Sequence, residues 1–259
     1  MKASFLNHDK PLLCAMIQCA TPDECCEKIR LSLAAGAEAI AIQLDRLKRN
    51  LRTRNHLTQI FAACAGKPIY VTSYRTGENI GMTDDECVEL LLLALECGAT
   101  LFDVMGDLYD RSPQYELTMD KEAVKKQMAL IDKIHQAGGE VLISSHTYKS
   151  TTLEENLMIA REQARRGADV IKIVNDAQSA DEIPIYIDAI QKIIHETGKK
   201  LLFLASGKAE LLRYIGPSLG VCMYLTVVDH GELDTEEQPK LYRAKALREN
   251  IVLTCEVEQ

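Results

Sequence analysis

The sequence predicts a single α/β domain folded as a (β/α)8 (TIM) barrel, from its length, an internal repeat and the composition of the repeated unit. The chain has 259 residues, and one barrel of this kind needs about 250. Helix-like segments that end in glycine alternate with short apolar runs rich in β-branched residues, which is the pattern of one βα unit. The glycines recur about every 30 residues, at Gly36, Gly66, Gly98, Gly138, Gly167 and Gly198.

The apolar runs that follow these glycines supply six strands, and two further runs complete a set of eight. The first of these is Leu12–Ile17 and the last is Val221–Val227. A doubly wound open sheet is the alternative, but it would need a glycine-rich phosphate-binding turn after the first strand. The segment there, residues 18–21 (QCAT), contains no glycine. We therefore expect one domain over residues 1–259, with the barrel proper at about 11–248.

Helix start signals fall between the expected strands. Thr21 and Glu24 can form a capping box around Pro22, and Thr83 with Glu86 can form a second box before the third helix. These signals and the apolar periodicity predict a helix that begins near residue 22, one over residues 87–96, and others near 121–137, 153–166, 180–197 and 236–248.

Composition argues against several function classes. The net charge is −8, and the chain has no dense basic block of the kind that binds nucleic acid. The most basic stretch, residues 46–54, is short and is expected to be a solvated face, with a polyanion contact as the alternative. No apolar run approaches the 18 or so residues of a membrane span, and residues 1–10 are too polar for a signal peptide.

The nine cysteines are odd in number and have no C-x-x-C spacing, which indicates reduced thiols in a cytoplasmic protein. The six histidines are scattered and have no carboxylate cluster beside them. We expect no cofactor, no structural metal, and a small molecule as the only ligand.

One lysine interrupts an apolar run and is the strongest single indication of chemistry. The run is residues 167–174 (GADVIKIV), a predicted buried strand with Lys172 near its middle. Burial disfavours the charged form of an amine, so we expect a lowered pKa for Lys172 and some free amine near neutral pH. A free amine that faces a cavity can form a Schiff base with a ketone or aldehyde. The alternative is a lysine close to the strand end whose ammonium reaches water.

Catalytic residues of such barrels gather at the carboxyl ends of the strands. An imidazole and an amine on adjacent strands could reach one ligand, the amine forming an iminium and the imidazole moving a proton at the neighbouring carbon. Two arginines could bind a carboxylate or phosphate. The alternatives are an ordinary loop histidine, surface ion pairs, and aspartates that bind lysines or cap helices. The polar residues at these ends are Gln43, Asp45, Ser73, Arg75, Asp103, Asp107, Ser144, Ser145, His146, Lys172, Ser206, Lys208 and, on the following helix, Arg213.

Several stretches resemble type I 3-dehydroquinate dehydratase, and the resemblance runs from about residue 11 to 247. It implies a cytoplasmic, homodimeric Schiff-base lyase of the shikimate pathway of aromatic amino acid biosynthesis. The stretches are residues 39–47 (AIAIQLDRL), 71–81 (VTSYRTGENIG), 144–152 (SSHTYKSTT) and 167–174, with a similar segment at 204–220.

The resemblance assigns roles to individual residues. Lys172 matches the family's imine-forming lysine and His146 its general acid/base. Arg213 matches the arginine that holds the substrate carboxylate, and Arg75 matches an arginine that lines the same site. Asp45 matches the aspartate that closes the second-strand motif.

The departures from the family pattern concern groups that contact substrate hydroxyls. In the Glu-x-Arg-x-Asp motif of the second strand this chain has Ala41 and Gln43, and Asn79 lies where the family has a glutamate that partners the histidine. The fourth strand keeps only Asp103 of an Asp-x-Glu pair, and residues 230–235 (HGELDT) replace a turn with serine and glutamine. We expect Gln43 and Asn79 to bind substrate.

The expected function is Schiff-base dehydration of 3-dehydroquinate to 3-dehydroshikimate by Lys172, with His146 as general acid/base. Asn79, or Glu78 after a loop shift, is the candidate to orient His146. The alternatives are a divergent Schiff-base lyase or aldolase that acts on a different hydroxy-keto acid, and a non-catalytic relative that binds a carboxylate.

Overall fold

The computed structural model describes residues 3–251, and it confirms the predicted (β/α)8 barrel as one domain. All strand pairs are parallel, in the order β7-β6-β5-β4-β3-β2-β1-β8. The amide of Cys222 donates a hydrogen bond of 2.8 Å to the carbonyl of Leu201 and links β8 to β7. The strands are β1 (Leu12–Ile17), β2 (Ala39–Gln43), β3 (Ile69–Thr72), β4 (Leu101–Met105), β5 (Glu140–His146), β6 (Val170–Ala177), β7 (Lys200–Gly207) and β8 (Met223–Thr226).

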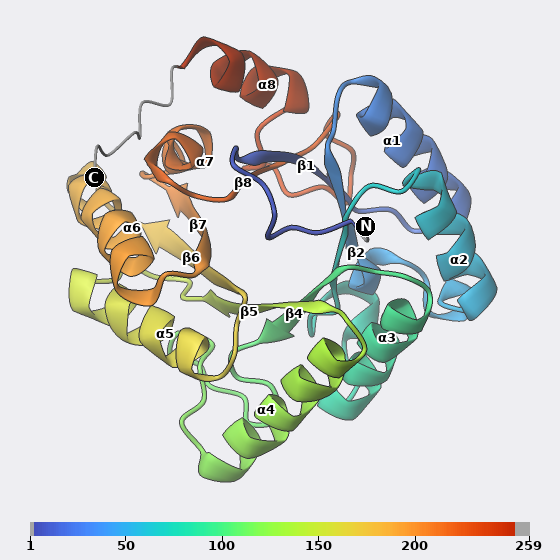
Figure 1. Ribbon diagram of the computed structural model, residues 1–259, viewed down its shortest axis with the longest axis horizontal. Coiled ribbons are helices and arrows are strands. Elements are labelled where there is room, and N and C mark those ends of the chain that lie inside the picture. Colours follow the sequence, from blue (N-terminus) through green and yellow to red (C-terminus); the bar gives the residue numbers. More distant parts are fainter. Residues whose placement is uncertain (1–2, 252–259) are drawn as a thin grey trace.

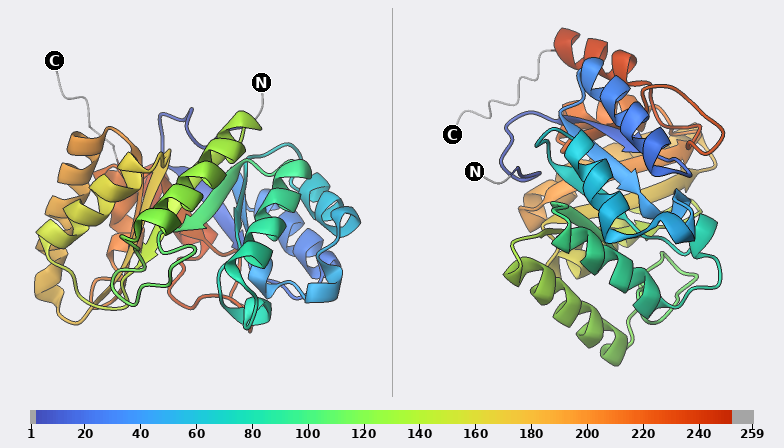
Figure 2. Two further views of the ribbon diagram at one scale, coloured as in Figure 1. Left: turned by 90° about the horizontal axis from the view of Figure 1, so that it is seen from below. Right: turned by 90° about the vertical axis from the view of Figure 1, so that its right-hand side faces the viewer.

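The helices form a ring outside the strands (Figure 1), and the side views show them lying alongside the barrel (Figure 2). Both predicted capping boxes are present, with Glu24 and Glu86 at the third helical position. The helices are α1 (Pro22–Ala34), α2 (Arg54–Ala63), α3 (Asp84–Glu96), α4 (Lys121–Gln136), α5 (Leu153–Arg165), α6 (Ile183–Thr197), α7 (Leu212–Ile215) and α8 (Leu241–Asn250), with short 3-10 turns η1 (Leu44–Arg46), η2 (Arg49–Leu51), η3 (Gly77–Asn79), η4 (Ala180–Glu182) and η5 (Gly216–Leu219).

Both faces of the strands are buried, which explains why the strands appear in the sequence as nearly continuous apolar runs. In β1, Leu13 and Ile17 pack with helix residues, whereas Cys14 and Met16 belong to a second cluster that includes Tyr70 of β3. Residues that alternate along each strand therefore face either the helices or the barrel interior.

Gly167 shows why glycine precedes the strand that carries the buried lysine. Its φ of +102° is a conformation that residues with a Cβ rarely adopt. A Cβ there would also lie 3.3 Å from Cγ2 of Ile131 on α4.

Within residues 3–251, no helix is long and apolar enough to span a membrane, and no three His, Cys, Asp or Glu side chains group as metal ligands. The cysteines in this range are all free thiols.

Candidate active site

A cavity of about 1010 Å³ lies at the carboxyl ends of the strands and receives residues from all eight strands or the loops after them. Asn79, one of the six residues expected to form the site, does not line it. The other five do line it, and they are Gln43, Arg75, His146, Lys172 and Arg213.

Strand pairing brings the lysine and the histidine to one side of the cavity. β5 and β6 pair in parallel, with Ser144 opposite Lys172 and His146 opposite Val174. Ser144 and His146 are two residues apart on β5, so their side chains point to the same face of the strand, and Lys172 is the partner of Ser144 on β6. His146 and Lys172 therefore both project toward the barrel mouth.

Lys172 is only 3% exposed and does not reach bulk water, in agreement with the burial predicted from its strand. Its Nζ lies 3.1 Å from Oδ2 of Asp103 and donates to the hydroxyls of Tyr70 at 3.2 Å and Tyr74 at 2.5 Å. The amine therefore sits in a compact polar cluster between β3, β4 and β6.

Asp103 is the centre of that cluster. Its Oδ1 accepts from Ser144 at 2.5 Å, and its Oδ2 accepts from the hydroxyls of Tyr70 and Tyr74. Burial alone would raise the pKa of this carboxyl. The charge of Lys172 and these hydrogen bonds outweigh burial and hold the pKa below the usual value of an aspartate.

No sequence pattern singles out the two tyrosines as site residues. Tyr70 lies in β3, whose other residues are isoleucine, valine and threonine, and Tyr74 lies in the loop just after that strand. Burial, followed by the negative charge of Asp103, raises the pKa of each phenol well above its usual value of about 10. Both tyrosines are therefore neutral hydrogen-bond donors at physiological pH.

His146 is oriented by Glu116, not by Asn79 or Glu78. Oε2 of Glu116 lies 2.6 Å from Nδ1 of His146 and accepts from the backbone amide of the same histidine at 2.9 Å. Glu116 lies in the loop between β4 and α4 and has a φ of +47°. This backbone conformation is uncommon outside glycine, and no local sequence pattern predicts it.

Asn79 supports the loop after β3 and does not face the cavity. It is 1% exposed, and its Nδ2 donates to the carbonyl of Tyr74 at 2.7 Å and to Oγ of Ser73 at 3.1 Å. Its Oδ1 accepts from Arg52. These bonds fix the loop after β3, while the side chain of Glu78 is exposed.

Arg75 is committed to protein carboxylates. Its Nε and Nη2 bind both oxygens of Asp84 at 2.7 and 2.8 Å, and its Nη1 binds Oδ1 of Asp107 at 2.6 Å. The sequence predicts that the guanidinium of Arg75 binds an anionic ligand. In the structure this guanidinium is instead part of an ion-pair network that joins the loop after β3 to α3 and to the loop after β4.

Arg213 has the properties of a carboxylate-binding residue. It is 5% exposed and, among residues 3–251, forms no ion pair. Its Nε donates to the carbonyl of Ala205 at 2.8 Å, its Nη2 to Oγ of Ser206 at 3.0 Å and its Nη1 to Oε1 of Gln238 at 3.3 Å. Burial lowers the pKa of this guanidinium. A buried cation that no carboxylate binds directly favours an anionic ligand.

Gln238 corrects an expectation about the loop after β8. The sequence suggested that this loop, at residues 230–235, lacks the glutamine of the family pattern. The fold brings Gln238, from slightly further along the same loop, onto Arg213 and into the cavity lining.

Two further residues of the second unit face the cavity. Gln43 accepts from Gln18 at 2.7 Å and donates to Asp45 at 2.9 Å, which fixes its amide.

Arg46 lines the cavity with a buried Nε that has no hydrogen-bond partner among the described residues. The basic stretch that starts at Arg46 is thus not entirely a solvated face. Asp45 is fully buried, with its pKa raised by burial, and accepts from Gln43, Thr76 and the amide of Tyr74.

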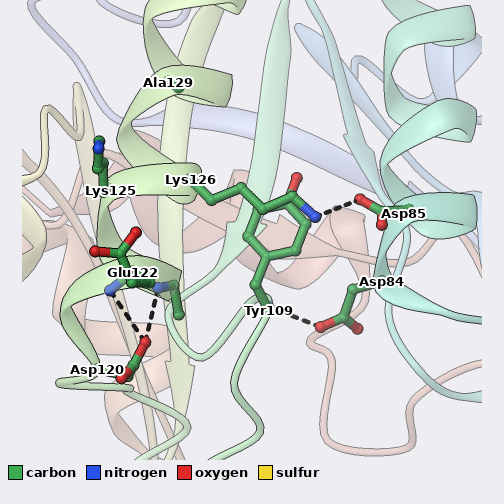
Figure 3. Close-up of a pocket in the computed structure, with 9 residues that line it drawn as sticks. Asp84, Asp85, Tyr109, Asp120, Glu122, Lys125, Lys126 and Ala129 are labelled. Atoms are coloured by element: carbon green, nitrogen blue, oxygen red, sulfur yellow. Dashed lines mark hydrogen bonds and ion pairs between the residues drawn. The ribbon is translucent and has the colours of Figure 1, made fainter.

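A separate groove of about 710 Å³ lies beside α3 and α4 (Figure 3). Lys126 binds Asp85 at 2.7 Å and lies 3.9 Å from the ring centre of Tyr109, while Asp84 accepts from the amide of Tyr109 at 2.7 Å. Asp84 also binds Arg75. The residues that line this groove therefore help to hold the ion-pair network of Arg75 in place.

Fold and cavity together define a (β/α)8 barrel whose mouth holds a buried lysine, a carboxylate-oriented histidine and an unpaired arginine. The family profile described as "Type I 3-dehydroquinase" matches residues 13–253. The chain belongs to this family.

Individual relatives are more distant. A 3-dehydroquinate dehydratase of Alkaliphilus oremlandii (strain OhILAs) is 29% identical over 109 residues, which cover 40% of this chain and 41% of that protein. Less than half of that relative's length is therefore aligned.

Solved structures of similar fold include two 3-dehydroquinate dehydratases. The enzyme from Geobacillus kaustophilus HTA426 has a TM-score of 0.78 at 15% identity, with 94% of this chain and 92% of that chain covered. The enzyme from Enterococcus faecalis has a TM-score of 0.77 at 16% identity, with 95% and 98% covered. At these identities the likeness concerns the fold.

Proposed function

We propose that this protein is a Schiff-base dehydratase that converts 3-dehydroquinate to 3-dehydroshikimate in the shikimate pathway, with Lys172 as nucleophile and His146 as general acid/base. One observation carries the proposal: the Lys172 amine, the His146–Glu116 pair and the unpaired Arg213 line the same cavity. Family membership and the activity named for the relatives agree with it.

Arg213 would bind the substrate carboxylate and fix the position of the ketone. Because Gln238 accepts from Arg213 through Oε1, its NH2 group remains a donor, and the hydroxyl hydrogen of Ser206 is free for the same reason. Three donor groups can therefore converge on one carboxylate. The Lys172 amine then attacks the ketone, and loss of water leaves an iminium that acidifies the neighbouring C–H bond.

His146 would remove that proton through Nε2. An ionised Glu116 can only accept a hydrogen bond, so the hydrogen of the neutral imidazole sits on Nδ1 and Nε2 carries the lone pair. Glu116 also stabilises the imidazolium formed by proton transfer. The same His146 then protonates the departing hydroxyl, and water hydrolyses the iminium to release product and the Lys172 amine.

The direct test is an assay for the ultraviolet-absorbing enone formed from 3-dehydroquinate. Wild-type protein is expected to turn over, and H146Q is expected to lose about 10²–10⁴-fold in kcat, the usual contribution of one general acid/base. H135Q is the matched control, because His135 lies on α4 and binds Asp169 outside the cavity. Negligible turnover by the wild type contradicts the assignment of this substrate.

Arg75 and Asn79 favour a second candidate, a Schiff-base lyase or aldolase for a different hydroxy-keto acid. Arg75 is occupied by Asp84 and Asp107, and Asn79 is bonded away from the cavity. Sites that discriminate hydroxyl groups do so through positioned polar partners. This candidate predicts covalent trapping on Lys172 by another keto acid together with negligible turnover of 3-dehydroquinate.

A non-catalytic carboxylate-binding relative makes a different prediction. It predicts binding of a carboxylate through Arg213 that survives Lys172→Ala, measured by isothermal calorimetry, and no covalent adduct on the wild-type protein after borohydride treatment. The absence of an adduct on the wild type, together with retained binding, separates this case from the enzymes. A cytoplasmic location and a homodimeric state are further proposals from the family resemblance, and light scattering of the purified protein tests the latter.

A further inference from the structure

The amine of Lys172 does not meet the cavity alone, because the hydroxyl of Tyr74 lies against it. Of the three groups that contact Nζ, Tyr74 is the nearest, at 2.5 Å, and it lines the cavity. Tyr70 is farther away at 3.2 Å, is fully buried and does not line the cavity. Asp103 is also fully inside the barrel.

Tyr74 also lies between the two groups to which we assign the chemistry. Its ring meets the imidazole of His146 edge-on, with centres 5.2 Å apart and planes at 88°. Its hydroxyl accepts from Lys172 and donates to Oδ2 of Asp103 at 2.5 Å. Its backbone is fixed at both ends, since the amide donates to Asp45 and the carbonyl accepts from Asn79.

Formation of an imine requires proton transfers that this arrangement can perform. The attacking nitrogen must lose protons, and the ketone oxygen must gain two protons to leave as water. A neutral phenol bonded to both the amine and a carboxylate can exchange protons with each. Burial raises the pKa of Tyr74 above its usual value, so its hydroxyl holds a proton at the start of the reaction and can donate it to the substrate.

We propose that Tyr74 is a catalytic residue that protonates the substrate's ketone oxygen during imine formation, with Asp103 as the group that resupplies its proton. This inference rests on the proposed Schiff-base function and adds a proton donor to it.

Imine formation then takes two proton relays through Asp103 and Tyr74. Lys172 ammonium gives a proton to Asp103, and the resulting amine bonds to the ketone carbon while the C=O pair moves to oxygen. That oxygen takes the hydroxyl proton of Tyr74, which regains one from Asp103. The nitrogen then gives a second proton to Asp103, the same relay returns it to the carbinolamine hydroxyl, and C–O cleavage releases water as the nitrogen lone pair forms the iminium. Asp103 ends as a carboxylate beside a cation, as it began.

The test compares Tyr74→Phe with Tyr70→Phe, which each remove one hydroxyl from the Lys172–Asp103 pair. Wild-type and variant proteins are mixed with 3-dehydroquinate, quenched with borohydride at increasing times, and the covalent adduct is quantified by mass spectrometry. Tyr74→Phe is expected to slow adduct formation about 10²-fold or more, as for loss of a general acid. Tyr70→Phe is expected to remain within about tenfold of wild type, since it contacts the same pair but cannot reach the substrate.

Tyr109→Phe is the control for tyrosine substitution elsewhere, because Tyr109 lies in the separate groove of Figure 3. Circular dichroism and thermal unfolding establish that each variant is folded. Equal losses in Tyr74→Phe and Tyr70→Phe would contradict a donor role and indicate that both hydroxyls only support the amine. Rapid trapping by Tyr74→Phe would overturn the inference while leaving the Schiff-base proposal intact. No adduct on the wild type would overturn both.

Discussion

Each of the two groups proposed to do the chemistry is held by a carboxylate. Asp103 lies 3.1 Å from the Lys172 amine, and Glu116 lies 2.6 Å from Nδ1 of His146. Removing one member of a buried charged pair is costly because the other is left without a partner. The two carboxylates therefore contribute both to the stability of the barrel mouth and to the orientation of its reactive groups.

Glu116→Gln tests the orientation of His146. The amide has nearly the same size but no charge, and it can turn its NH2 group toward Nδ1, which would favour the unproductive tautomer. We expect kcat for 3-dehydroquinate to fall about 10²-fold or more with a smaller change in KM. Glu78→Gln is the matched control, because the exposed Glu78 side chain lies outside the cavity. Equal kcat values in the two variants would contradict the role of Glu116.

The lowered pKa of Asp103 predicts a specific pH dependence of stability. A carboxyl whose pKa is lower in the folded than in the unfolded chain contributes stability that is fully present above its unfolded pKa of about 3.9. That contribution is lost as the pH falls through the folded value. Asp103→Asn is expected to cost about 3–5 kcal/mol at pH 7, since it leaves Lys172 buried and unpaired. Urea unfolding should show this difference shrinking below pH 4, and a constant difference would contradict the account.

At the scale of elements, the fourth βα unit supplies the carboxylates that bind the reactive side chains of the fifth and sixth units. β4 carries Asp103 and the loop after it carries Glu116, whereas their partners lie on β6 and β5. The loop after β3 adds Tyr74 and is tied to α3 through Arg75 and Asp84. The site therefore depends on the relative position of units β3 to β6.

Gly167 is predicted to contribute to that positioning. Gly167→Ala places a Cβ at a φ of +102° and 3.3 Å from Ile131, whereas Gly98→Ala has a similar φ of +104° and meets nothing within 4 Å. The backbone conformation alone should cost each variant about 1–2 kcal/mol. The contact with Ile131 should make Gly167→Ala the less stable of the two in urea unfolding. A smaller loss for Gly167→Ala than for Gly98→Ala would contradict this packing argument.

The elements were predictable because each βα unit carries its own local signals. Glycine marked the helix ends, capping boxes marked two helix starts, and the strands appeared as apolar runs. Lys172 was recognisable because it is the exception within one such run. Glu116, Gln238 and Tyr74 were not recognisable in this way. Loops and tertiary contacts bring them to His146, Arg213 and Lys172, and their neighbouring residues in the sequence do not specify these contacts.

At the scale of the whole molecule, closure of the barrel makes the site. Lys172 on β6 and Arg213 after β7 face Gln43 and Arg46 of the second unit across one cavity only because β8 returns to β1. The chain carries a net charge of −8, yet Arg46 and Arg213 present cations without bonded counter-charges to the cavity. These two guanidinium groups are therefore available to bind an anionic substrate.

The position of the covalent product of borohydride reduction in the presence of 3-dehydroquinate tests the proposed imine on Lys172 most directly. Peptide mass spectrometry is expected to find the adduct on Lys172, with none in Lys172→Met and an unchanged yield in Lys208→Met, whose lysine lies outside the cavity lining. Turnover of 3-dehydroquinate without any adduct on Lys172, or an adduct that persists in Lys172→Met, would contradict the proposal that this buried amine forms the imine.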